Sequence, residues 1–109
     1  MANIEAVVCL IATPVADAER VAAATVEREL AACANVVPLV RSIYRWEGEV
    51  RTDEEALLIL KTARGALPAL ERLLDEIHPY DTFELVALDI ATGSSSYLDW
   101  IGASVNARP

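Results

Sequence analysis

Residues 36–49 form the stretch that most constrains the fold of this chain. Within it, Tyr44 and Trp46 alternate with polar residues over Ser-Ile-Tyr-Arg-Trp-Glu, and Gly48 follows directly. An alternation with a period of two is typical of a half-buried β-strand, and a glycine that interrupts it indicates a turn or a bulge. The stretch therefore predicts a long strand whose aromatic side chains belong to a pocket or an interface rather than to a catalytic centre.

A second extended run, residues 54–62, follows the first. Its centre, residues 56–60, is apolar throughout, and such a run predicts a strand that is covered on both faces. We expect residues 48–53 to turn the chain, so that the two runs pair as a long antiparallel hairpin.

Helical patterns flank this hairpin on both sides. Apolar residues recur at every fourth position from Ala18 to Leu30, and a similar apolar stripe runs through residues 65–77, as in amphipathic helices. We expect Cys33 to close the first helix and Asn35 to take a left-handed conformation after it. The boundaries predicted for the other elements are helices over residues 15–32 and 65–77, strands over residues 5–12 and 83–91, and a short final helix capped by Ser96.

The predicted order is strand, helix, strand, strand, helix, strand, and then a short helix. Two split β-α-β halves in this order make an α+β, ferredoxin-like βαββαβ sandwich with both helices on one face of a four-stranded sheet. A chain of 109 residues corresponds to a single domain, residues 1–109. The other face of the sheet and the hairpin would stay uncovered, so we predict that the chain self-associates.

Charge and cysteine content narrow the classes of partner and location. The net charge of −8 argues against nucleic acids and anionic membranes, both of which are bound through Lys and Arg. The N-terminus has no basic residue before its apolar run, so we do not expect a secretory signal. Cys9 and Cys33 lie far apart and form no CxxC motif, which predicts free thiols and a cytoplasmic location.

Six blocks carry a resemblance to a known family over nearly the whole chain. They are Glu-Leu-Ala-Ala-Cys-Ala-Asn at 29–35, Ser-Ile-Tyr-Arg-Trp-Glu-Gly at 42–48, Leu-Lys-Thr at 60–62, Ile-His-Pro-Tyr at 77–80, Glu-Leu at 84–85 and Tyr-Leu-Asp-Trp-Ile at 97–101. In this order and spacing they resemble the CutA divalent-cation-tolerance family. The resemblance implies a fold similar to that of PII signalling proteins, a stable homotrimer, and a role in tolerance of copper and other divalent cations.

The resemblance also implies copper ligands: a cysteine at the end of the first strand and two adjacent histidines before Pro-Tyr. His78 matches one of these histidines, Ile77 stands in place of the other, and Cys9 lies slightly before the family position. We therefore name His78 and Cys9 as candidate metal ligands. The structural alternatives are a helix-terminal His78 whose ring bonds a carbonyl group and a Cys9 that packs in the core.

A second candidate site consists of aromatic and charged residues from several elements. Aromatic walls with a few polar groups are typical of a small-molecule pocket, but aromatic residues are also enriched at subunit interfaces. Lys61 would need a carboxylate partner if it is covered, and Glu84 or Glu47 is the expected one. The candidate set for the pocket or interface is Tyr44, Trp46, Lys61, Tyr80, Glu84 and Trp100.

These features support three functions, none of them enzymatic, because one histidine and two thiols do not supply a nucleophile with its base. The first is a homotrimeric protein of divalent-cation tolerance that binds copper and needs no organic cofactor. The second is a PII-like signalling module that captures a small carboxylate or a nucleotide between subunits. The third is a trimeric anchor or scaffold for other proteins.

Overall fold

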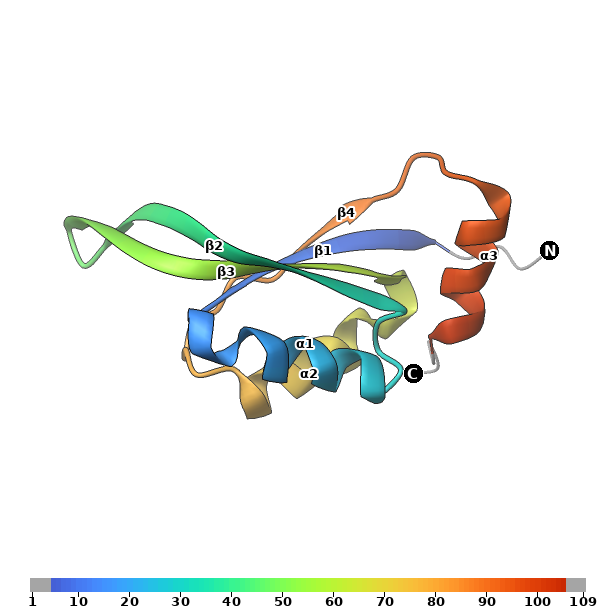
Figure 1. Cartoon of the computed structure of the whole chain (residues 1–109), viewed down its shortest axis with the longest axis horizontal. Helices are drawn as coiled ribbons and strands as arrows, with labels where there is room; N and C mark the ends of the chain where they lie inside the picture. The colour runs from blue at the N-terminus through green and yellow to red at the C-terminus, as the bar shows by residue number, and fades with distance from the viewer. Residues whose placement is uncertain (1–4, 106–109) are drawn as a thin grey trace.

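The computed structural model describes residues 5–105, which form one antiparallel sheet with helices on one face and at one end (Figure 1). The elements in chain order are β1 (Ala6–Thr13), η1 (Val15–Asp17), α1 (Ala18–Glu27), β2 (Cys33–Trp46), β3 (Glu49–Ala63), η2 (Arg64–Ala66), α2 (Leu67–Ile77), β4 (Val86–Asp89) and α3 (Ser95–Ser104).

The sheet has the strand order β2-β3-β1-β4, and every neighbouring pair is antiparallel. At its centre, Cys9 of β1 lies opposite Leu60 of β3 on one side and Ala87 of β4 on the other. The two edge strands are therefore β2, which is long and belongs to the hairpin, and β4, which is short.

The helices α1 and α2 lie side by side against one face of the sheet (Figure 1). Alternate residues of the central strands face them, and Ile11, Leu58 and Leu60 are fully buried there. Helix α2 adds Leu70 and Leu74, which are also fully buried. This α+β arrangement confirms the predicted ferredoxin-like fold, while α3 packs at the opposite end from the hairpin with Ile101 buried.

The hairpin of β2 and β3 projects well beyond the helices (Figure 1). Its turn consists of Glu47 and Gly48, which both have positive φ angles, of 50° and 79°. Such a pair makes the two-residue turn that fits the twist of an antiparallel hairpin. The prediction of a turn over residues 48–53 was wrong, because the polar residues after Gly48 belong to a strand that extends into solvent.

The first long helix also ends earlier than predicted. Helix α1 stops at Glu27, and the left-handed residue is Glu29, with a φ of 60°, rather than Asn35. Asn35 lies inside β2, which begins at Cys33. The N–H groups of Leu30 and Ala31 both bond the carbonyl of Thr25. These bonds end the helix and turn the chain toward the sheet, although the apolar spacing continues to Leu30.

Three smaller expectations differ from the structure. The last strand covers only Val86–Asp89 instead of residues 83–91, and the final helix has its N-cap at Ser94 rather than Ser96. The apolar run of residues 56–60 is fully buried only on the side that faces the helices. Leu57 and Ile59 point to the other face and remain half-buried, because the elements described between residues 5 and 105 supply no second layer over most of that face.

Candidate functional site

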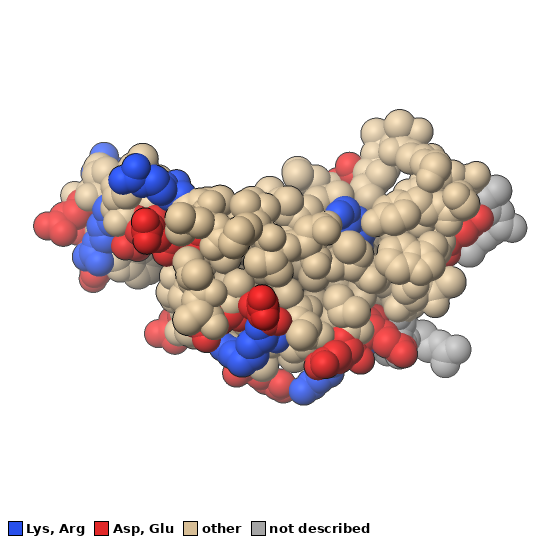
Figure 2. All heavy atoms as spheres, in the orientation of Figure 1, with Lys and Arg blue, Asp and Glu red and all other residues tan. Residues whose placement is uncertain are grey.

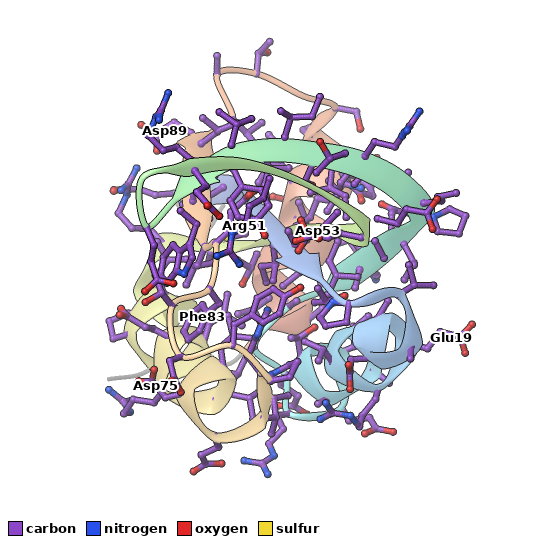
Figure 3. The ribbon with its side chains drawn as sticks, turned by 90° about the vertical axis from the view of Figure 1, so that its left-hand side faces the viewer. Glu19, Arg51, Asp53, Asp75, Phe83 and Asp89 are labelled. Atoms are coloured by element: carbon purple, nitrogen blue, oxygen red, sulfur yellow. The ribbon has the colours of Figure 1, made fainter. Side chains whose placement is uncertain are left out.

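A hollow of about 700 Å³ lies along the projecting hairpin, from Glu55 near its base to Trp46 beside its turn. Strands β2 and β3 form one wall, and the segment of residues 79–84 between α2 and β4 forms the other. Figure 3 looks onto this end of the molecule and shows Arg51 and Asp53 below the hairpin ribbon, above the segment that carries Phe83. The charged and aromatic side chains of the lining include Tyr44, Trp46, Asp53, Glu55, Tyr80 and Glu84.

Strand register explains why the hairpin contributes these side chains. The two-residue turn pairs Tyr44 with Arg51 and Ser42 with Asp53, so Tyr44 and Asp53 are diagonal neighbours on one face. Along β3, Arg51, Asp53 and Glu55 have the opposite parity to the core residues that face the helices. The hollow therefore lies on the face of the sheet that the helices do not cover.

Two tyrosine–carboxylate pairs line the hollow. The Tyr44 hydroxyl donates a hydrogen bond to Asp53, and the Tyr80 hydroxyl donates to Glu55 at 3.0 Å. The hydrogen bond to Asp53 raises the pKa of Tyr44. Burial, together with the hydrogen bond to Glu55, raises the pKa of Tyr80 to about 12. Both phenols therefore remain protonated donors at neutral pH, and each one directs its proton to a carboxylate.

The predicted set of pocket residues splits into two groups. Tyr44, Trp46, Tyr80 and Glu84 do meet in the hollow. Lys61 does not, because it lies six residues along β3 from Glu55, about 20 Å in a strand.

Lys61 and Trp100 have other neighbours. Lys61 donates a hydrogen bond to Asn35, so neither Glu84 nor Glu47 is its partner. Trp100 lies on α3, where its ring centroid is 5.5 Å from that of Tyr97.

His78 sits between α2, β1 and the wall of the hollow. It is 8% exposed, and its Nε2 lies 2.9 Å from the carbonyl oxygen of Ala12. Its Nδ1 accepts a hydrogen bond from the backbone N–H of Tyr80 at 3.1 Å. Because Nδ1 accepts, Nε2 carries the proton and donates to Ala12. Both ring nitrogens are thus occupied, and in this arrangement His78 does not fit the role of a metal ligand, which needs a free nitrogen lone pair.

Cys9 lies in the interior of the sheet. It is fully buried on the helix-facing side of β1, beside Leu60 and Ala87. Burial raises the pKa of its thiol to about 11, whereas a metal ligand would have to be a thiolate. The assignment of Cys9 and His78 as copper ligands stays a prediction.

Residues 5–105 were also searched for groups of metal-binding side chains and for membrane-spanning helices. In that range no three His, Cys, Asp or Glu side chains are placed to hold one metal ion. None of the helices described there is long and apolar enough to cross a membrane.

Sequence reasoning missed Arg51, Asp53 and Glu55 as residues of the hollow. Arg51 and Asp53 lie in the stretch that was expected to turn the chain, residues 48–53, and no site residue was expected there. The signal that could have found them is the turn itself: a two-residue turn at 47–48 fixes the pairing, and the pairing places Asp53 diagonal to Tyr44. The place of Glu55 in the hollow could be seen only in the tertiary structure, because its partner Tyr80 lies beyond helix α2.

The fold defines the class of protein: small ferredoxin-like α+β proteins with a long projecting hairpin. The family model described as "CutA1 divalent ion tolerance protein" matches residues 6–104. The chain therefore belongs to the CutA1 divalent ion tolerance family, as the sequence blocks indicated, and the function of that family is tolerance of divalent cations.

Individual relatives agree with this assignment. The divalent-cation tolerance protein CutA of Thermus thermophilus is 50% identical over 95 residues, which cover 86% of this chain and 92% of the relative. Its solved structure superposes with a TM-score of 0.88 at 46% identity, covering 93% of this chain and 99% of that one. The structure of CutA1 from Oryza sativa gives a TM-score of 0.91 at 39% identity, covering 94% and 95%. Protein CutA of Mus musculus is 40% identical over 77% of this chain, which spans only 48% of the mouse protein.

Proposed function

We propose that this chain acts as a homotrimer in tolerance of divalent cations and has no catalytic activity. Family membership supports the cation-tolerance role, and three copies is the number that the family resemblance implies. The observation that carries the assembly is the projecting hairpin, which extends beyond the helices and leaves apolar side chains exposed.

Exposed apolar side chains on the hairpin and on the edge strands support this assembly. Ile43 and Val50, on the hairpin face opposite to the hollow, are 71% and 64% exposed. Leu39 of β2 and Leu88 of β4 are each 54% exposed. Figure 2 shows charged groups on the hairpin and on the helices, with a mostly uncharged surface between the hairpin and α3. Apolar surface and open strand edges of this kind favour association with further copies.

The mass of the assembly tests this part of the proposal. We expect light scattering of the purified protein to give three times the 11.8 kDa chain mass. Ile43→Glu should lower that mass because it places a charge in the buried contact. Val26→Glu is the matched control, since Val26 is an exposed apolar residue of α1. A folded wild-type protein that stays at the mass of one chain would refute the assembly.

We propose further that copper is bound weakly and between subunits, because residues 5–105 of one chain place no three candidate ligands together;. Calorimetric titration with Cu(II) should show binding by the wild type and little by Ile43→Glu. Equal binding by both proteins would exclude a shared site. His78→Gln and Cys9→Ala then decide the two candidate ligands: unchanged Cu(II) binding in either variant removes that residue from the site.

A second candidate function, capture of a small molecule, is favoured by one observation, the hollow. Its volume of about 700 Å³ lies within the usual range of ligand pockets, about 300–1,000 Å³. Tyr44, Trp46 and Tyr80 supply aromatic surface, and the carboxylates supply a few oriented polar groups. We expect a thermal-shift screen of metabolites to give hits that Trp46→Leu abolishes. A broad screen without any hit would contradict this function.

A further inference from the structure

We propose that the hollow binds a compact organic cation, such as a primary amine or a quaternary ammonium group. This inference rests on the proposal that the hollow takes a small molecule, and it names the chemical class of that molecule. The ligand class follows from the charges of the hollow, among them one buried carboxylate, and from its aromatic walls.

The charges in the hollow are unequal. Four carboxylates line it, those of Asp53, Glu55, Asp81 and Glu84, against the single cationic group of Arg51. The ion pairs of Arg51 are with Glu47 at 3.8 Å and Glu49 at 4.0 Å, both at the tip of the hairpin. Within residues 5–105, none of the four carboxylates of the hollow has a cationic partner closer than 4.0 Å. The hollow therefore attracts cations and repels anions.

Glu55 is the strongest single indication of a cationic ligand. It is only 8% exposed, and it lines the hollow. Its hydrogen bond within the described chain comes from the neutral hydroxyl of Tyr80, although a carboxylate accepts about four such bonds. A buried carboxylate without a counter-charge is unfavourable. A cation in the hollow would supply the missing charge and further donors.

The aromatic side chains and their hydrogen bonds favour the same class of ligand. Tyr44, Trp46 and Tyr80 are between 37% and 46% exposed, so part of each ring surface is available for cation–π contact. The two phenol protons are already donated to carboxylates, which leaves the phenol oxygens as acceptors for an ammonium group. Lys61, the residue that would have anchored a carboxylate or phosphate, is bonded to Asn35 outside the hollow.

An organic cation fits better than a metal ion for reasons of geometry. In the part of the chain that the structure describes, no three acidic, His or Cys side chains converge closely enough to hold a metal. The hollow of about 700 Å³ is also far larger than an ion, and its aromatic walls match the apolar parts of an alkylammonium compound.

The test is calorimetric titration of the full-length protein, in its native assembly, with tetramethylammonium chloride and with butylammonium chloride. Sodium acetate and sodium phosphate at equal ionic strength are the anionic probes. We expect saturable binding of at least one cation and none of the anions. Glu55→Gln keeps the shape of the side chain and removes its charge, and should weaken cation binding about tenfold.

Glu54→Gln is the matched control. Glu54 is the neighbouring residue, it is exposed, and it points to the opposite face of β3, so its variant should bind as the wild type does. Trp46→Leu, at an exposed position of the hairpin, should weaken binding about fivefold through loss of the cation–π contact. It supplies a second test that does not depend on the folding of the Glu55 variant, whose mass and circular dichroism are measured alongside.

The possible outcomes distinguish the proposed cationic ligand from the more general proposal that the hollow binds a small molecule. Saturable binding of acetate or phosphate instead of the cations would overturn the ligand class and leave a small-molecule site in place. Cation binding that is equal in wild type, Glu55→Gln and Trp46→Leu would overturn the location. Absence of binding by every probe, together with an empty metabolite screen, would overturn both.

Discussion

Replacement of His78 provides the sharpest test of how the wall of the hollow is built. The His78 ring joins two segments: Nε2 to the carbonyl of Ala12 at 2.9 Å, and Nδ1 to the N–H of Tyr80 at 3.1 Å. It also stacks on Phe83 with a centroid distance of 5.1 Å. In His78→Ala a buried carbonyl and a partly buried N–H lose their partners, at about 1–3 kcal/mol for each buried group. With the lost packing, we expect the free energy of unfolding to fall by about 2–4 kcal/mol.

Two conservative variants divide this effect between its parts. Asn at position 78 can accept from Tyr80 but cannot reach Ala12, whereas Gln can donate to Ala12 but aligns poorly with Tyr80. Each of His78→Asn and His78→Gln should therefore cost about 1–2 kcal/mol. The assay is urea unfolding followed by circular dichroism at one fixed protein concentration, with and without a chelator.

The result that would refute this reasoning is a His78→Ala variant within about 0.5 kcal/mol of the wild type, which is the range of surface substitutions without a structural role. A second contradicting result would be a wild-type protein that loses as much stability on chelation as it does on mutation. That outcome would show that the ring acts through a metal ion rather than through Ala12 and Tyr80.

The remaining predictions concern the turn, the core and high pH. Gly48→Ala should lower the free energy of unfolding by about 1 kcal/mol, because φ is +79° while no atom lies within 4 Å of the added Cβ; Gly48→Asn should cost less, and equal values in urea unfolding would contradict the strain argument. Leu58→Ala should cost about 2–5 kcal/mol, because this fully buried residue leaves a cavity, and a loss below 1 kcal/mol would contradict its place in the core. Cys9 and Tyr80 have folded-state pKa values of about 11 and 12, above their ordinary 9.0 and 10.0. As pH rises, the thiol and the phenol therefore ionise at a lower pH in the unfolded chain than in the folded protein. The free energy that these two groups contribute to folding is complete below pH 9 and is lost between pH 9 and 12;. Cys9→Ala should move the onset of that loss upward in alkaline unfolding curves, and an unchanged onset would contradict the burial of the thiol.

The identity and order of most elements could be predicted from the sequence, because they depend on local patterns. The alternation around Tyr44 and the apolar stripe of α2 each reflect a backbone period that needs no partner. Boundaries were less predictable. The polar residues after Gly48 resemble a loop in composition, yet they form a strand because the two-residue turn lets them pair with β2;. Helix α1 ends at Glu27 because the chain must enter the sheet at Cys33, which its own helical pattern does not reveal.

The candidate site divides in the same way. Tyr44, Trp46, Tyr80 and Glu84 were predicted to lie together, and they do line one hollow. The residue that completes the site, Glu55, could not be predicted, because its burial depends on a loop that arrives more than twenty residues later in the chain.

The amino-acid sequence alone determined the family, the succession of strands and helices, and the surplus of apolar surface on the hairpin. Each of these depends on contiguous residues or on short spacings between residues. Tertiary structure decided which charges face one another. Lys61 and Glu55 share a strand and a face, yet the first bonds Asn35 and the second bonds Tyr80, since distance along a rigid strand separates them. The chemistry of the hollow is therefore set by strand register and by the path of one loop.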